Sequence, residues 1–210
     1  NTRKSVDNEL IILSSNRLRH DVARRLRLDI GYSDKVGLRP RSLYGISPIA
    51  MSIVNDNETD SFAFTATLGA DSTLSLTNFA GMGVNETAAT STVKAHFGDT
   101  INTPIGSIII NPTLYYNKNE KGHEIRVSKT SIAAAAGLAY VNVALADKNS
   151  SIIAISKMDS NPRRAEDVIN TLITCYEDDT KADKKRISEA TAAFISDRLA
   201  LISGELGDVD

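Results

Sequence analysis

Residue types that often carry catalysis are present in this chain, but their spacing forms no recognisable active site. A P-loop requires Gly-x4-Gly-Lys-Ser/Thr, because its glycine-rich backbone must curl round a phosphate. The segment that leads to Lys129 has His123 and Ser128 where those glycines must stand. Gly81-x-Gly83 lacks the third glycine of the dinucleotide fingerprint, since position 86 is Glu. We therefore predict no nucleotide binding and no cofactor site.

The histidines and the single cysteine give no signal for a metal or a nucleophile. His20, His96 and His123 lie in three separate segments, none followed by a second histidine three or four residues on. Cys175 falls on an apolar helical face, so a buried structural thiol is the expected reading. No Gly-x-Ser-x-Gly sequence occurs. We predict no catalytic residue and no metal ligand.

Composition places the chain among ordinary globular proteins. It has 210 residues, 41% hydrophobic and 24% charged, with a net charge of −2. A nucleic-acid partner is not predicted, since it would require a strongly basic domain. No apolar run approaches the ~18 residues that cross a bilayer. Because the chain starts without methionine and stops inside a helical pattern, we expect membrane segments of a longer protein to flank it.

Charge is unevenly spread along the chain. Residues 17–41 hold eight Lys or Arg against three Asp, whereas residues 158–210 hold twelve acidic and seven basic residues. One interpretation is two solvated helix faces. The other is a basic segment that faces anionic lipid. Each basic residue near such a surface contributes about 1 kcal/mol to the free energy of membrane binding. This proposed basic segment consists of Arg17, Arg19, Arg24, Arg25 and Arg27.

The elements that would position these residues follow from hydrophobic periodicity. Helical spacing predicts a helix over residues 5–28, with Ser5 as its N-cap and Gly31 ending the pattern. Period-two alternation predicts a hairpin of residues 61–68 and 73–77, and further strands are expected at 106–110, 124–127 and 151–156. Residues 81–91 read as a loop and residues 131–146 as a buried helix, with its cap at Ser128, Thr130 or Ser131.

A long final helix is predicted to begin at Asn161, as N-cap, and Pro162. Its apolar face is broad up to Tyr176 and then gives way to a wholly polar stretch, residues 177–186. Apolar residues return seven apart at Ile187, Phe194 and Leu201, flanked by Ile195, Leu199, Ile202 and Leu206. Such a helix leaves its domain and seeks a partner helix. The prediction is an α/β (α+β) body, residues 1–176, with a mixed sheet packed with helices, and the start of a protruding arm, residues 177–210.

The order of several segments resembles the Wzz family of polysaccharide co-polymerases, including the extracytoplasmic part of the Wzc-type tyrosine autokinases. Residues 9–28 resemble the family's first helix, and residues 44–49 its Tyr-x-x-Ser-Pro turn. Residues 101–112 are similar to the family's Thr-Pro-Phe-Gly strand. The most specific likeness is residues 151–176, and residues 192–207 resemble the start of the family's helical arm.

The resemblance implies an inner-membrane protein with this domain on its periplasmic, extracytoplasmic side, next to the lipid surface. Such proteins form homo-oligomers and act with a polysaccharide polymerase and export machinery on the chain length of capsular, exo- or O-antigen polysaccharide. The chain itself is then a scaffold and not an enzyme. The alternative is the sensory or assembly domain of a membrane tyrosine kinase whose catalytic domain lies beyond Asp210. A periplasmic export adaptor would require lipoyl or β-domain sequence, which is not found here.

Overall fold

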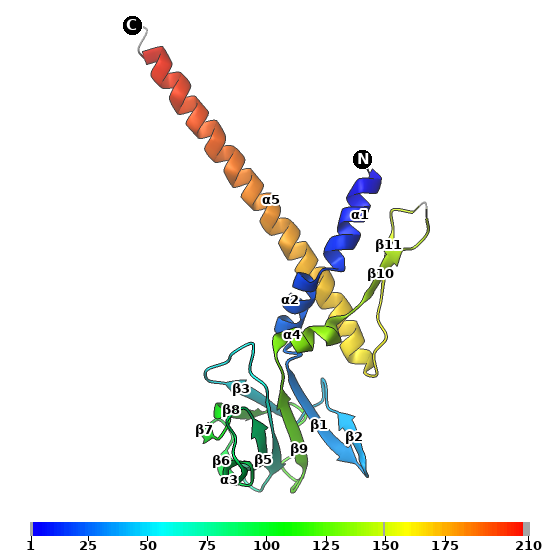
Figure 1. Cartoon of the computed structure of the whole chain (residues 1–210), viewed down its shortest axis with the longest axis vertical. Helices are drawn as coiled ribbons and strands as arrows, with labels where there is room; N and C mark the ends of the chain where they lie inside the picture. Colours follow the sequence, from blue (N-terminus) through cyan, green and yellow to red (C-terminus); the bar gives the residue numbers. More distant parts are fainter. Residues whose placement is uncertain (1, 149, 208–210) are drawn as a thin grey trace.

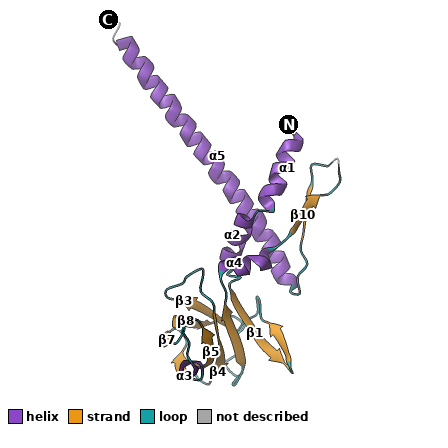
Figure 2. Cartoon of the chain, viewed as in Figure 1, coloured by secondary structure: helices purple, strands orange, loops and turns teal. Residues whose placement is uncertain are grey.

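The chain folds into a β-rich body at one end, a layer of helices in the middle and one long helix that projects away (Figures 1 and 2). A computed structural model describes residues 2–148 and 150–207. The predicted α/β fold with a long C-terminal helix is confirmed. Within the described residues, no helix combines the length and apolarity needed to cross a membrane.

The larger sheet of the body has six strands in the order β2-β1-β9-β4-β5-β6, and every pairing in it is antiparallel. The predicted hairpin is present as β4 and β5, whose alternating apolar residues face inward. The strand bounds are β1 (Ile30–Val36), β2 (Arg39–Ser42), β4 (Phe62–Leu68), β5 (Thr73–Gly81), β6 (Val93–His96) and β9 (Glu124–Lys129).

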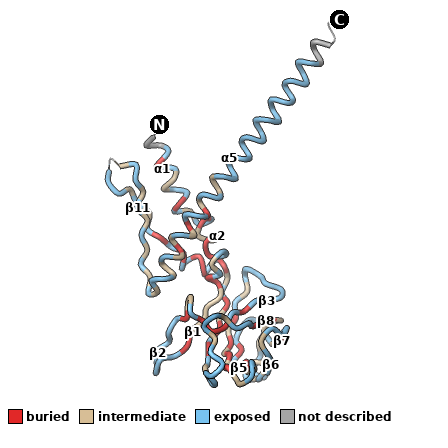
Figure 3. Tube along the Cα trace, turned by 180° about the vertical axis from the view of Figure 1, so that it is seen from behind, coloured by how far each residue is buried: buried red, intermediate tan, exposed pale blue. Residues whose placement is uncertain are grey.

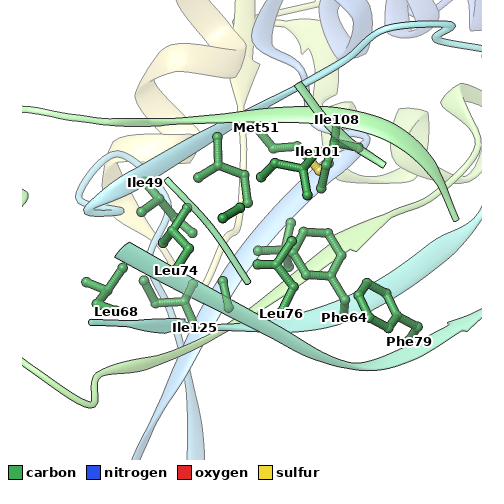
Figure 4. Packing of buried hydrophobic residues seen from close by; sticks show 14 of the residues in the cluster. Ile49, Met51, Phe64, Leu68, Leu74, Leu76, Phe79, Ile101, Ile108 and Ile125 are labelled. Carbon is green, nitrogen blue, oxygen red and sulfur yellow. The ribbon is translucent and has the colours of Figure 1, made fainter. Parts of the chain in front are cut away.

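A second sheet packs against the first. It contains three antiparallel strands in the order β3-β8-β7, with bounds β3 (Ile49–Ile53), β7 (Thr100–Thr103) and β8 (Gly106–Pro112). Figure 4 shows Met51, Ile101 and Ile108 of this sheet opposite Phe64 and Leu76 of the larger one. The body core therefore lies between two sheets, and the helices gather at one end of it.

The helical layer has its own hydrophobic core. It is built from α2 (Asn16–Leu26), α4 (Ile132–Ala135), the 3-10 turn η1 (Ala136–Ala139) and the start of α5 (Pro162–Gly207). Leu18 and Val22 of α2 and Val168 and Leu172 of α5 are fully buried. This cluster holds the base of the long helix against the rest of the chain.

The predicted single helix over residues 5–28 is wrong. The structure has α1 (Thr2–Leu13), which contains Ser5, and a separate α2. The break occurs because the Ser15 side chain accepts the N–H of Leu18 and so caps a new helix. Arg27, with φ of 50°, ends α2, and Gly31 lies in β1 instead of terminating a helix.

The predicted helix over residues 131–146 is only partly correct. Ser131 does cap α4, since its hydroxyl accepts the N–H of Ala134 at 3.2 Å. However, helical structure stops at Ala139, and β10 (Asn142–Leu145) follows, paired in a two-stranded ribbon with β11 (Ile153–Ser156). The predicted loop at residues 81–91 contains one short helix, α3 (Glu86–Ala89).

The start of α5 is as predicted. The Asn161 side chain accepts the N–H of Arg164 at 3.1 Å, and Pro162 is the first helical residue. From there 46 residues run without a break. At 1.5 Å per residue the helix is about 69 Å long. Of the predicted arm, residues 208–210 lie outside the described residues.

Candidate functional site

The distal part of α5 is a helix without neighbours in the described chain. Figure 3 shows that burial ends where the helix leaves the helical layer, and every residue from Lys181 to Ser203 is exposed. The three residues of the predicted seam, Ile187, Phe194 and Leu201, are 62%, 62% and 64% exposed.

More apolar side chains belong to this surface than the seam alone. An α-helix turns by 100° per residue, and on this scale the exposed apolar side chains of the distal helix fall within a face about 160° wide. We call it the arm face, and its members are Ile187, Phe194, Ile195, Leu199, Leu201 and Ile202. Arg198 lies in the same face, with its guanidinium carbon 5.8 Å from the centre of the Phe194 ring. The helix therefore presents a broad apolar stripe that its own chain leaves uncovered.

The base of α5 is clamped to α2 by ion pairs. Arg25 donates to Asp178 at 2.7 Å, and Arg17 donates to Asp179. These bonds join segments more than 150 residues apart, at the point where α5 leaves the helical layer. Both pairs are partly exposed, so solvent screens them and each contributes little by itself. Together with the buried contacts beneath them, they fix the direction in which the helix leaves.

The structure places the proposed basic segment on and just after α2, in the helical layer between the body and the arm (Figure 1). Its five arginines are not a bare basic surface. Arg24 donates to Glu58, Arg27 donates to Asp29 and Asp56, and Arg19 lies over the Tyr140 ring. A lipid surface would therefore compete with carboxylates of the same chain for these residues.

Cys175 lies between α2 and α5, and it is 2% exposed. Burial raises the pKa of its thiol above the ordinary value, so the protonated form is favoured. A protonated, buried thiol is a poor nucleophile. The predicted buried structural role is the one this geometry supports.

A group of buried charges, which the sequence did not predict, lies at the junction of β1 and β9. The ammonium group of Lys129 is fully buried and lies 3.0 Å from a carboxylate oxygen of Asp29, which is itself 2% exposed. Arg27 holds both oxygens of Asp29 at 3.0 Å. Lys129 occurs in an alternating strand at an inward position, where sequence patterns ordinarily place an apolar residue. The group is placed to join the sheet to the helical layer.

Sequence analysis also missed a cavity of about 630 Å³, which lies between the body and the base of α5. Tyr44, Arg163 and Asp167 line it, from the segment after β2 and from the first turns of α5. Tyr44 lies in residues 44–49 and the other two in residues 151–176, both segments of the family resemblance, but nothing in the sequence predicts that they meet. Only the fold brings them together.

No group of three or more His, Cys, Asp or Glu side chains that could hold a metal ion occurs in the part of the chain that the structure describes. The sequence matches no protein-family model, and a search of curated proteins returns no match. The family resemblance therefore rests on the residues of the segments and on the order in which the segments occur.

Proposed function

We propose that this chain is the extracytoplasmic scaffold domain of a polysaccharide co-polymerase, which regulates the chain length and export of a surface polysaccharide. The observation that carries the proposal is the uncovered arm face on a helix whose base is firmly fixed. The resemblance of the sequence to Wzz-like proteins supplies the biological setting: an inner membrane, a polymerase and the export machinery.

The arm face supports a role in assembly. Most of the stability of helices in proteins comes from packing of an apolar face, and burying a large apolar side chain contributes roughly 1.5–3 kcal/mol. A second copy of the same helix offers a matching stripe. Homo-oligomers are the commonest assemblies of soluble domains, so a ring or dimer of arms is the simplest partner for this surface.

The clamp at the base of α5 supports a scaffold in particular. Because α2 and α5 share a buried core and ion pairs, the arm and the helical layer can turn only together. Subunits joined through such arms would hold their bodies at a set spacing. Subunits held at a fixed spacing would surround a polymerase or a growing polymer with the same set of protein surfaces each time.

The experiment that tests this proposal is Phe194→Ser with Leu201→Ser in the full-length protein in its native cell. We expect polymer synthesis to continue and the length distribution on a polysaccharide gel to broaden, because the arms no longer associate. The matched control is Lys185→Ser with Glu189→Ser, an exposed ion pair on the same helix that lies outside the apolar set. An unchanged distribution in the Phe194/Leu201 variant, at normal protein levels, would refute the assignment.

The basic segment is proposed to face the anionic surface of the inner membrane. We expect the chain to sediment with vesicles that contain phosphatidylglycerol, and the bound fraction to fall as salt screens the charges. Reversing Arg24, Arg25 and Arg27 to Glu should abolish binding. Reversing Lys184, Lys185 and Arg186 on the exposed arm changes the net charge equally and should leave binding intact. Equal losses in both variants would mean that net charge alone is sensed.

A further inference from the structure

The cavity between the body and the base of α5 has the size of a small-molecule site. Its volume is about 630 Å³. Ligand pockets commonly hold ≈ 300–1,000 Å³. Its walls come from β1, from β3, from the segment between β2 and β3, and from the first turns of α5. None of the contacts assigned to assembly above involves it.

The inner wall of the cavity is apolar. Along the edge of β3 that faces the cavity, side chains of the same chain already bond to backbone groups. The N–H of Met51 donates to the Tyr32 hydroxyl at 2.7 Å. The Ser47 hydroxyl donates to the carbonyl of Ile49 at 2.7 Å and accepts its N–H at 3.3 Å. These side chains take three of the backbone groups with which an added peptide strand would pair. The occupant is therefore a compact molecule and not an extended peptide.

Three arginines and one aspartate line the cavity. Arg27 is paired with Asp29 and Asp56, and Arg164 with Asp159, which leaves Arg163 and Asp167 on the outer wall, four residues apart on α5. Arg163 donates to the carbonyl of Gly45 at 3.0 Å and to the Tyr115 hydroxyl at 3.2 Å, both of them neutral acceptors. Asp167 accepts the Tyr44 hydroxyl at 2.9 Å. Arg163 and Asp167 do not form an ion pair with each other. A guanidinium has five N–H donors and a carboxylate about four acceptor positions, so each keeps capacity for a ligand.

The position of Arg163 is set by the backbone beneath it. Gly45 has φ of +74°, and a Cβ added there would lie 2.7 Å from the Cδ of Arg163. The guanidinium can rest on this turn only because residue 45 has no side chain. On the other side, the Arg164 guanidinium lies 5.9 Å from the centre of the Tyr44 ring and is held by Asp159. Both polar groups of the outer wall are thus held in place by their neighbours.

We propose that this cavity binds a neutral hexopyranose unit of a glycan. Two neighbouring hydroxyls of such a ring can donate to Asp167 and accept from Arg163, while its C–H face packs on Tyr115 and on the apolar wall. The opposite charges cancel, so a neutral ligand fits better than a phosphate, which Asp167 would repel. An acyl chain would leave both charged groups desolvated and unpaired. The choice of a glycan rests on the proposed function, and it adds a direct contact with the polymer.

The test is an NMR titration of the isotope-labelled 210-residue chain with neutral hexasaccharides of glucose, galactose, mannose and N-acetylglucosamine. Inorganic phosphate and phosphatidylglycerol vesicles are titrated in parallel. We expect saturable shifts at Tyr44, Gly45 and Tyr115 with at least one hexasaccharide. Arg163→Gln and Asp167→Asn should each weaken that binding tenfold or more.

The matched control is the pair Asp183→Asn and Arg186→Gln, which likewise removes one anion and one cation, here an exposed ion pair further along the same helix, and should leave affinity unchanged. Tyr115→Ala is a further variant, because this half-exposed ring can be removed without opening a core. Each variant is checked for an unaltered thermal unfolding midpoint.

Three results would overturn the inference: no hexasaccharide shifts these residues, the Arg163 and Asp167 variants bind as tightly as the control, or only phosphate or vesicles produce the shifts. Because Arg163 and Asp167 lie away from the arm face, their variants should keep arm-dependent assembly. Loss of glycan binding alone then refutes this inference, and loss of assembly control alone refutes the proposed function.

Discussion

At the scale of single residues, the costliest groups to bury are the charges of Lys129 and Asp29, which lie beneath the helical layer. Lys129 is buried with Asp29, and its ammonium group also donates to the carbonyls of Asn57 and Thr130, at 3.2 Å each. A buried ion pair is not by itself evidence of high stability, because both charges lose water. Removing one partner, however, leaves the other charge buried and uncompensated.

We therefore expect Asp29→Asn to lower the free energy of unfolding by about 3–5 kcal/mol. The measurement is urea unfolding at neutral pH, with Asp197→Asn on the exposed arm as the control. That control should change stability by less than about 0.5 kcal/mol. A loss at Asp29 as small as the control's would show that Asp56 and the carbonyls of Asn57 and Thr130 suffice to compensate Lys129.

Residue-scale features were the least accessible to sequence reasoning. The role of Cys175 could be predicted, because it lies on a helical face whose neighbours are apolar. The roles of Lys129, Tyr44 and Arg163 could not be predicted. Their partners come from distant segments, and no residue spacing in the sequence indicates these contacts. Arg24 and Arg25 read as free basic charges in the sequence, and only the fold shows that they pair with Glu58 and Asp178.

At the scale of elements, prediction succeeded where one local signal was strong. The alternation in β4 and β5 and the Asn161-Pro162 start of α5 are such signals. The strands between residues 30 and 53 went unassigned because they are short, polar or interrupted by Gly37 and Pro40. The helix predicted over 131–146 followed alanine propensity, which tertiary pairing of β10 with β11 overrides.

The contact between α2 and α5 is the element-scale feature that determines where the arm points. Leu172 is fully buried in it, whereas Leu199, on the same helix, is 59% exposed. We expect Leu172→Ala to lower the free energy of unfolding by about 2–5 kcal/mol, because it leaves a cavity. Leu199→Ala should change it by less than about 0.5 kcal/mol. Denaturant unfolding of the two variants compares one substitution in two environments, and equal effects would mean that the helix base is not packed as described.

At the scale of the whole molecule, a compact two-sheet body and an uncovered helix are joined by the helical layer. Such a shape divides the work: the body supplies stability and a cavity, and the arm supplies the exposed apolar surface that we propose binds another copy. The sequence could predict this division from one helix, because the core-facing pattern up to Tyr176 changes to a polar stretch and then to spaced apolar residues. It could not show how the body and arm are oriented, since that depends on α2.

The division predicts a characteristic pattern of amide hydrogen exchange. Residues 162–176 should be protected at every protein concentration, because their apolar face is buried in the helical layer. Residues 187–203 should exchange quickly in dilute solution, since a bare helix frays. Raising the concentration should protect them as arms pair. Phe194→Ser with Leu201→Ser should remove this concentration dependence, and Lys185→Ser with Glu189→Ser should keep it. Slow exchange of residues 187–203 in dilute monomer would contradict the idea that the arm needs a second copy.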